Sequence, residues 1–271
     1  MAEKNYAALA KRRVNRPGNQ VGYRKLLVYG RNKKGKTYFS LSAGIDQTLV
    51  LDPEKGTDTM HKLNPYRWPI EKWEDVPEAY GALRTGRLSP AFLELGPSQE
   101  PFTWVSVDGL TRFNNMALHY VRRQREEANL ETRPGMIDRR DYNKSGELMK
   151  GFLLNMHSLK MNVCFTAQER VMGGDDDSDD EESGVQRVPD LPQSVRGTVN
   201  SIVEVIGRIY TSKAMFKNPK GGEPLEKLQR RLWIAPHGSF DTGYRSDYEL
   251  PEYVKNPSIP KLTKLMLEGA E

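Results

Sequence analysis

The chain has 271 residues, 28% of them charged, and its mean hydropathy is −0.70. No apolar run approaches the roughly 20 residues that a membrane-spanning helix needs, and the N-terminus lacks the apolar stretch of a secretory signal. A single cysteine, Cys164, excludes an internal disulfide and a multi-cysteine metal site. These features predict a cytoplasmic protein with no membrane partner.

The formal charge of +5 understates how basic most of the chain is. Seven acidic residues gather in the short segment 175–182, inside a predicted flexible loop at about 172–195. The basic remainder favours a polyanionic partner, although a basic protein with no nucleic-acid ligand is the alternative. The acidic segment can mimic DNA, slow non-specific binding or dock a basic partner, and the sequence does not choose among these roles.

Residues 1–24 are basic and show little apolar periodicity, which predicts an N-terminal arm. The arm can serve oligomerisation or DNA contact, or it can be a plain disordered terminus. We find no internal repeat and no clear linker beyond it. Residues 25–255 are therefore predicted to form one core, followed by a C-terminal tail or helix over 256–271.

A P-loop pattern follows the first predicted strand, residues 25–29. It consists of Gly30, Arg31, Asn32, Lys33, Lys34, Gly35, Lys36 and Thr37. The two glycines let successive backbone amides point inward at a phosphate chain. Lys36 can reach the β- and γ-phosphates, and Thr37 can offer its hydroxyl to Mg²⁺ at the start of a helix. The pattern predicts a nucleoside triphosphate site, and a basic surface turn that matches by chance is the alternative.

Buried strands and helices then alternate along the chain. Further strands are predicted at 47–52, 102–107 and 162–167, and helices from the P-loop to Gly44, at about 71–84, at 110–128 and at about 142–160. This alternation predicts an α/β fold with a mainly parallel central sheet flanked by helices. Beyond the acidic segment, apolar alternation predicts antiparallel strands at 198–210 and 230–235 that extend the C-terminal edge of the sheet.

Three polar residues follow predicted strands at the sheet edge where ligands of open α/β folds bind. Asp108 ends the third strand and can hold the water shell of the Mg²⁺ that Thr37 ligates. Glu54 follows the second strand and can orient or deprotonate the attacking water, with Asp52 as its rival. Gln168 precedes the long loop and can sense the γ-phosphate, so that the loop moves with nucleotide state. A plain turn or capping residue is the alternative at each position.

The P-loop, the acid after the second strand, the aspartate after the third and the glutamine before a long loop together resemble the RecA-like recombinase core. Over residues 26–245 the chain looks most like compact phage proteins that keep this core alone, the Sak-type single-strand annealing proteins and related phage P-loop ATPases. The resemblance implies a DNA-stimulated ATPase that uses ATP and Mg²⁺ and forms a ring or filament of identical subunits. It also implies that single-stranded DNA is the partner, annealing or recombination the process, and the host cytoplasm the location if a phage encodes the chain.

In RecA-like proteins two loops hold single-stranded DNA. The first maps here near residues 122–144 and the second to residues 169–196. The cations that the resemblance assigns to DNA are Arg122, Arg123, Arg139, Arg140, Lys144 and Arg170. A solvated helix face offset by nearby glutamates is the alternative for the first group.

The chain departs from the family pattern in two places. Its second loop carries the acidic run, which repels phosphate. Where the family often has a Lys-x-Arg element that reaches a neighbouring subunit's γ-phosphate, this chain has Gly243, Tyr244 and Arg245. Only Arg245 therefore joins Lys36, Glu54 and Gln168 as a catalytic candidate.

Two other functions remain open. A replication accessory ATPase, such as a helicase loader, would act through a replicative helicase or a single-strand-binding protein. An ATP-gated DNA-binding or annealing module would need no catalysis by Glu54. A small-molecule kinase is disfavoured because the sequence shows no acceptor-site motif and no arginine-rich lid.

Overall fold

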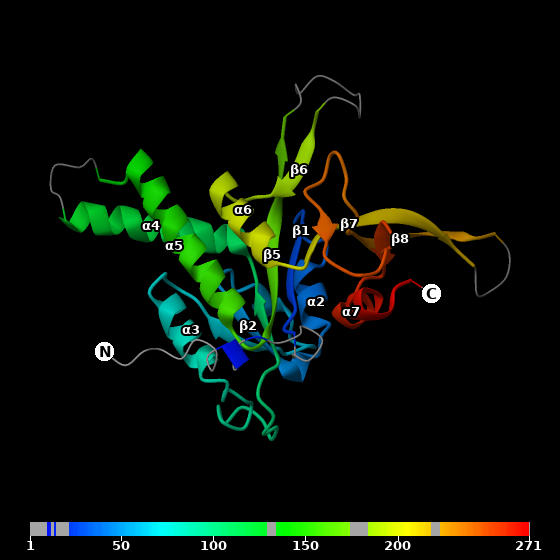
Figure 1. Cartoon of the computed structure of the whole chain (residues 1–271), viewed down its shortest axis with the longest axis horizontal. Coiled ribbons are helices and arrows are strands. Elements are labelled where there is room, and N and C mark those ends of the chain that lie inside the picture. Colours follow the sequence, from blue (N-terminus) through cyan, green and yellow to red (C-terminus); the bar gives the residue numbers. More distant parts are fainter. Residues whose placement is uncertain are drawn as a thin grey trace.

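The computed structural model describes residues 10–11, 14, 22–128, 134–173, 184–217 and 223–270. Within these residues, ten strands form one sheet along the path β10-β8-β7-β1-β5-β4-β2-β3, with β6 and β9 attached beside it (Figure 1). The acidic segment and nearly all of the N-terminal arm lie outside the described residues. Over the described parts of the chain, no helix is long and apolar enough to cross a membrane.

Five strands build most of the parallel part of the sheet. They are β1 (Lys25–Gly30), β2 (Thr48–Asp52), β3 (Tyr66–Pro69), β4 (Trp104–Val107) and β5 (Asn162–Met172). β1, β2 and β4 are buried along their whole length, as expected for parallel strands covered on both faces. β5 lies between β1 and β4 in the sheet. Gln168, the last residue of β5 that pairs with β1, therefore lies between the P-loop and Asp108.

Helices cover both faces of the sheet. One face packs against α3 (Asp75–Arg84), α4 (Leu110–Ala128), α5 (Arg139–Ser158) and α6 (Gln193–Ile202), which share one hydrophobic cluster. The other face packs against α2 (Lys36–Leu41) and α7 (Ile259–Glu268) through a second cluster. The predicted fold class, a mainly parallel α/β sheet flanked by helices, is confirmed.

Antiparallel strands complete the C-terminal edge. β7 (Val205–Phe216) runs parallel to β1 and antiparallel to β8 (Leu225–Trp233), while β9 (Gly243–Tyr244) pairs with β7 and β10 (Tyr253–Lys255) with β8. The far halves of β7 and β8 leave the sheet as a long two-stranded arm, visible on the right of Figure 1. A second arm rises where β5 pairs with β6 (Gln186–Pro189). The predicted antiparallel extension is thereby confirmed.

Some element boundaries differ from the sequence prediction. The predicted strand at 198–210 is wrong in its first part, because α6 occupies Gln193–Ile202 and β7 starts only at Val205. Val195 and Val199 lie one helical turn apart and are both fully buried, so the helical spacing prevails over the apparent alternation. The sequence patterns also did not predict β3. The strand predicted to start at 230 begins earlier, because β8 starts at Leu225.

Part of the long flexible loop predicted at about 172–195 is regular secondary structure in the described residues. β5 continues to Met172, β6 occupies Gln186–Pro189 and α6 starts at Gln193. Gln168 consequently lies within β5, at the point where this strand stops pairing with β1 and starts pairing with β6.

Candidate nucleotide site

The P-loop joins β1 to α2 and is held against β7 and β8 by both of its glycines. A Cβ at Gly30 would lie 2.3 Å from the carbonyl oxygen of Ile209. Gly35 has a φ of +93°, and a Cβ there would lie 2.6 Å from Nε of Arg230. A side chain at either position would therefore strain the backbone or push β7 and β8 away from the loop.

Lys36 is buried at the centre of the site. Its ammonium donates to the carbonyl oxygens of Gly30 (2.9 Å) and Arg31 (3.1 Å) and to Oε1 of Gln168 (3.2 Å). Burial lowers the pKa of Lys36, while the carboxylates of Asp108, Glu54 and Glu169 act in the opposite direction. The ammonium group is thus enclosed by groups that a phosphate chain can replace.

Thr37 and Asp108 form the pair that the sequence assigned to a metal. The Thr37 hydroxyl donates to Oδ2 of Asp108 at 2.8 Å, and the Thr166 hydroxyl donates to Oδ1 at 2.7 Å. Burial raises the pKa of Asp108, and these two hydrogen bonds partly oppose the shift. One hydroxyl and one carboxylate beside a phosphate-binding loop fit Mg²⁺, which keeps several waters and takes few protein ligands.

Glu54 and Asp52, the two rival acids after β2, have different surroundings. Asp52 is 1% exposed and accepts hydrogen bonds from the amides of Gly56 (3.1 Å) and Thr57 (3.0 Å), so its carboxylate is committed to the turn. Glu54 is far more exposed than Asp52 but is partly enclosed, and its Oε1 lies 3.1 Å from the position of a Cβ on Gly109, beside Asp108. Partial burial and then the charge of Asp108 raise the pKa of Glu54. The geometry favours Glu54 over Asp52 as the group that faces an attacking water.

Gln168 connects the P-loop with two other parts of the site. Its side chain accepts from Lys36, and its amide donates to the Thr111 hydroxyl (3.1 Å) in α4. Its carbonyl accepts from the amide of Asp190 (2.8 Å) after β6. A shift of the Lys36 side chain can therefore be transmitted through Gln168 to both α4 and the β5–β6 arm.

Glu169, the residue beside Gln168, belongs to the site although no sequence pattern predicted it. Its side chain is only 1% exposed and pairs with Nε of Arg208 at 2.6 Å and Nε of Arg31 at 3.5 Å. The buried carboxylate of Glu169 thus links the exposed Arg31 of the P-loop with Arg208 of β7, along a cavity of about 430 Å³. The only sequence signal was its position directly after Gln168.

The structure does not bring Arg245 to the P-loop of its own chain. Its guanidinium donates to the carbonyl of Ser201 at 2.9 Å, and its amide donates to that of Glu204 at 2.7 Å. The adjacent Tyr244 pairs with Val205, near the start of β1, whereas the P-loop follows the end of β1. A catalytic role for Arg245 would therefore have to be played at a neighbouring subunit.

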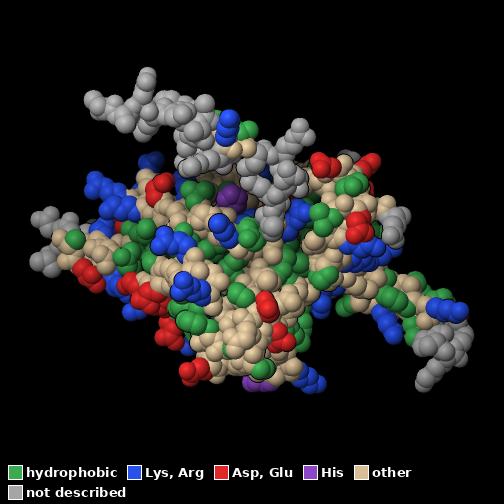
Figure 2. Space-filling model, turned by 60° about the horizontal axis from the view of Figure 1, so that its bottom comes forward, with side chains coloured by type: hydrophobic (Ala, Val, Ile, Leu, Met, Phe, Trp, Pro, Cys, Tyr) green, Lys and Arg blue, Asp and Glu red, His purple; other side chains and the backbone are tan. Residues whose placement is uncertain are grey.

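The cations assigned to DNA lie in different settings. Arg122 pairs with Glu126 (3.5 Å), and Arg123 pairs with Glu74 and Glu127. The remaining four are exposed, three of them on α5 and one on β5, namely Arg139, Arg140, Lys144 and Arg170. In the face that Figure 2 presents, Lys and Arg side chains are scattered among acidic ones rather than gathered in one patch.

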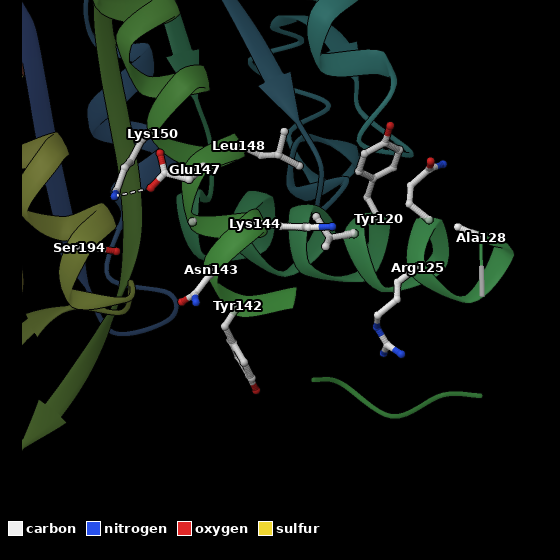
Figure 3. Close-up of a pocket in the computed structure, with 13 residues that line it drawn as sticks. Tyr120, Arg125, Ala128, Tyr142, Asn143, Lys144, Glu147, Leu148, Lys150 and Ser194 are labelled. Carbon is white, nitrogen blue, oxygen red and sulfur yellow. Dashed lines mark hydrogen bonds and ion pairs between the residues drawn. The ribbon is translucent and has the colours of Figure 1, made fainter. Parts of the chain in front are cut away.

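A groove of about 870 Å³ runs between α4, α5 and the start of α6, and Lys144 lines it. Figure 3 shows its residues, which include Tyr120, Arg125, Tyr142, Lys144, Glu147 and Ser194. Arg125 forms a close ion pair with the buried Asp141 (2.9 Å), and Lys150 pairs with Glu147 (2.8 Å). The charges of these two cations are therefore largely offset within the protein.

A glycine loop that ends in Lys-Thr lies between a parallel strand and a helix, and its threonine donates to a carboxylate, which is the arrangement of P-loop nucleoside triphosphatases. The chain belongs to the AAA_24 family, described as an AAA domain, whose profile matches residues 23–246. The family confirms the predicted ATPase class, while the narrower resemblance to phage annealing proteins stays a prediction.

Among solved structures, the flagellar accessory protein FlaH from Methanocaldococcus jannaschii is similar over 95% of each chain, with 13% identity and a TM-score of 0.36. That TM-score is too low to bear on fold or function. No curated protein sequence matches the chain.

Proposed function

We propose that this ATPase binds single-stranded DNA, hydrolyses ATP with Mg²⁺, and uses the nucleotide to control DNA annealing or recombination of the phage type. One observation carries the proposal. Gln168, which contacts the P-loop lysine, lies in the same strand as Arg170, an exposed cation only two residues further along β5. The proposed triphosphate site and the exposed cation Arg170 are therefore joined through one continuous strand.

The residues present are suited to ATP and Mg²⁺. The P-loop amides and Lys36 would hold the phosphates, and Thr37 together with Asp108, through water, would hold the ion. Bound Mg²⁺ would neutralise charge that develops on the phosphate oxygens during hydrolysis. Glu54 would orient the attacking water and accept its proton.

Coupling to DNA would proceed through Gln168. A γ-phosphate would compete with the Gln168 carboxamide for the ammonium of Lys36, whose three donors already have partners in Gly30, Arg31 and Gln168. The backbone of Gln168 is bonded to Asp190 at the foot of the β5–β6 arm, so a shift at Gln168 would move the arm. After hydrolysis the carboxamide would return to Lys36, which makes the movement reversible.

The DNA would follow cations on this arm and on α5. Arg170 and Arg187 lie on the paired strands β5 and β6, and Arg139, Arg140 and Lys144 lie on α5. Exposed Tyr142, on the same helix, can stack on a base. Contacts of this kind attract the phosphate backbone without reading its sequence, so binding should weaken as salt increases.

The test measures the ATPase rate and the particle size with and without single-stranded DNA at two salt concentrations. We expect DNA to raise turnover at low salt, a smaller increase at high salt, and a larger particle when ATP and DNA are both present. Unchanged turnover across a DNA titration at low salt would contradict the proposal. Arg170→Glu should lose the stimulation but keep the basal rate, because this cation does not contact the P-loop residues.

A second candidate is an accessory ATPase that acts through a protein partner such as a replicative helicase. It is favoured by one observation, the pairing of Arg122 and Arg123 with glutamates, which weakens the cationic surface expected of the first DNA loop. Capture of a purified helicase by this protein, combined with an ATPase rate that DNA does not change, would select this function over the first.

A further inference from the structure

Strand β8 brings an arginine to the P-loop that the nucleotide site described above does not use. The Nε atom of Arg230 lies 2.6 Å from the position that a Cβ of Gly35 would occupy, and its guanidinium carbon lies 2.8 Å from the same point. The guanidinium also stands over the ring of Tyr38, 5.8 Å from its centroid, in the first turn of α2. Arg230 therefore spans the distance between the end of the P-loop and the exposed side of α2.

Arg230 differs in its partners from three of the four cations of the P-loop. Arg31 pairs with Glu169, Lys34 donates to the Thr211 hydroxyl at 3.0 Å, and Lys36 donates to carbonyl oxygens and to Gln168. Among the described residues, no carboxylate forms an ion pair with Arg230 and no acceptor is hydrogen-bonded to its guanidinium. A positive group with five donors is thus directed at a phosphate-binding loop without an anion of the protein beside it.

The backbone holds Arg230 in this place. Arg230 pairs directly with Thr211 of β7, so both side chains stand on the same face of the two-stranded arm, the face that meets the P-loop. Its carbonyl oxygen accepts from the amide of Asn256 at 2.8 Å, which fixes the strand from the other side. The strand that carries Arg230 is thus held from both sides, and a preorganised backbone lowers the entropy cost of a contact with a ligand.

We infer that Arg230 is a nucleotide-binding residue that contacts the phosphate chain in the same subunit, and that Tyr38 beside it contacts the nucleoside. The inference rests on the proposed ATP-binding function of the P-loop and names two further residues of that site. A triphosphate that follows the loop amides toward α2 passes Gly35, where the guanidinium lies, and its sugar and base then reach the exposed ring of Tyr38. Arginine is suited to phosphate because its planar fork can donate two parallel hydrogen bonds.

Two ligands separate the two roles. Dissociation constants for ATP and for inorganic tripolyphosphate, both with Mg²⁺, are measured for the full chain and its variants. Arg230→Ala should weaken both ligands by about 10- to 100-fold, since it removes charge-assisted hydrogen bonds to phosphate. Tyr38→Ala should weaken ATP by about tenfold, the size of a lost stacking contact, and leave tripolyphosphate within about twofold of the wild type. Arg230→Lys should recover only part of the affinity, because the ammonium keeps the charge but loses the fork.

Arg231→Ala is the matched control. Arg231 is the next residue of β8, points to the opposite face and stands 4.7 Å from the ring centroid of Tyr253, so it repeats the arginine–tyrosine stack away from the P-loop. It should bind both ligands as the wild type does, and thermal unfolding should show that every variant is folded.

The outcomes distinguish this inference from the proposed function. If the wild type binds both ligands and Arg230→Ala binds them equally well, the inference is wrong and the proposed function stands. If Arg230→Ala weakens ATP alone, the arginine does not contact phosphate, and this part of the inference is overturned. If the wild type binds neither ligand, both the inference and the proposed function fail.

Discussion

Two buried lysines at opposite ends of β1 carry the same charged group in different surroundings. Lys25, at the start of the strand, is 3% exposed and donates to the carbonyl oxygens of Leu159 (3.0 Å) and Met161. Lys36, just beyond the end of the strand, is 9% exposed and donates to two carbonyl oxygens of the P-loop at 2.9 and 3.1 Å. Burial lowers the pKa of both ammonium groups.

The partners explain why we assign a structural role to Lys25 and propose a nucleotide-binding role for Lys36. The carbonyls around Lys25 belong to the connection from α5 into β5, which is packed into the hydrophobic core. The partners of Lys36 belong to a glycine loop and to the side chain of Gln168, and an anion can replace them. A buried lysine therefore becomes a binding group only where the surrounding acceptors can be exchanged for a ligand.

The largest expected effect follows from removing the functional lysine. Lys36→Ala should abolish ATP binding, because the phosphates lose the ammonium group that the loop encloses, while the fold stays intact. Calorimetric titration with ATP and a thermal unfolding curve check the two parts separately. ATP affinity like that of the wild type would contradict the assignment of the site and, with it, the difference between the two lysines.

Glu54→Gln should affect turnover rather than binding. Loss of the group that accepts a proton from water should lower kcat by about 10²- to 10⁴-fold and leave the affinity for ATP nearly unchanged. Asp52→Asn is the informative control, because the Asp52 carboxylate accepts hydrogen bonds from the turn amides. This variant should lower the free energy of unfolding more than it lowers the rate of the chemical step. DNA annealing that survives Glu54→Gln with ATP present would instead support an ATP-gated module without catalysis.

Gln168→Ala should uncouple the nucleotide from DNA. Lys36 would keep its two carbonyl partners, so ATP affinity should change by only a few-fold, but the stimulation of turnover by single-stranded DNA should fall to near the basal rate. The measurement is the ratio of rates with and without saturating DNA. A variant that retains the full stimulation would show that the β5–β6 arm is not controlled through this carboxamide.

That Lys36, Asp108 and Gln168 lie together beyond the end of β1 was predictable from sequence, because the P-loop is contiguous and Asp108 and Gln168 mark the ends of strands or strand pairings. The parallel sheet was predictable for the same reason, since its buried strands are short apolar runs. The contacts of Glu169 with Arg208 and of Arg230 with Gly35 were not, because they join segments far apart in the chain that meet only through the order of strands. The helix at Gln193–Ile202 was missed because valines one turn apart also fit a partly alternating strand.

The smallest expected effect concerns the structural lysine and depends on pH. The pKa of Lys25 is lowered to about 8 in the folded protein by burial, against an opposing contribution from Glu204, whereas the unfolded chain has the ordinary value of 10.5. Between these pH values the unfolded state binds more protons, so the free energy of unfolding should rise with pH by about 1–3 kcal/mol from this group. Below about pH 8 both states are protonated, and this contribution to the slope disappears.

Lys25→Met tests that sign in urea unfolding between pH 7 and pH 10.5. The variant leaves two carbonyl oxygens without their donor, so its absolute stability mixes that cost with the relief of a buried charge, and only the slope with pH is diagnostic. The slope should be smaller than in the wild type, whereas Lys72→Met, at an exposed lysine, should keep the wild-type slope. ATP affinity at pH 7 should be the same in all three proteins. If Lys25→Met weakened ATP binding instead, the two ends of β1 would be coupled, and the division between a structural and a functional lysine would no longer hold.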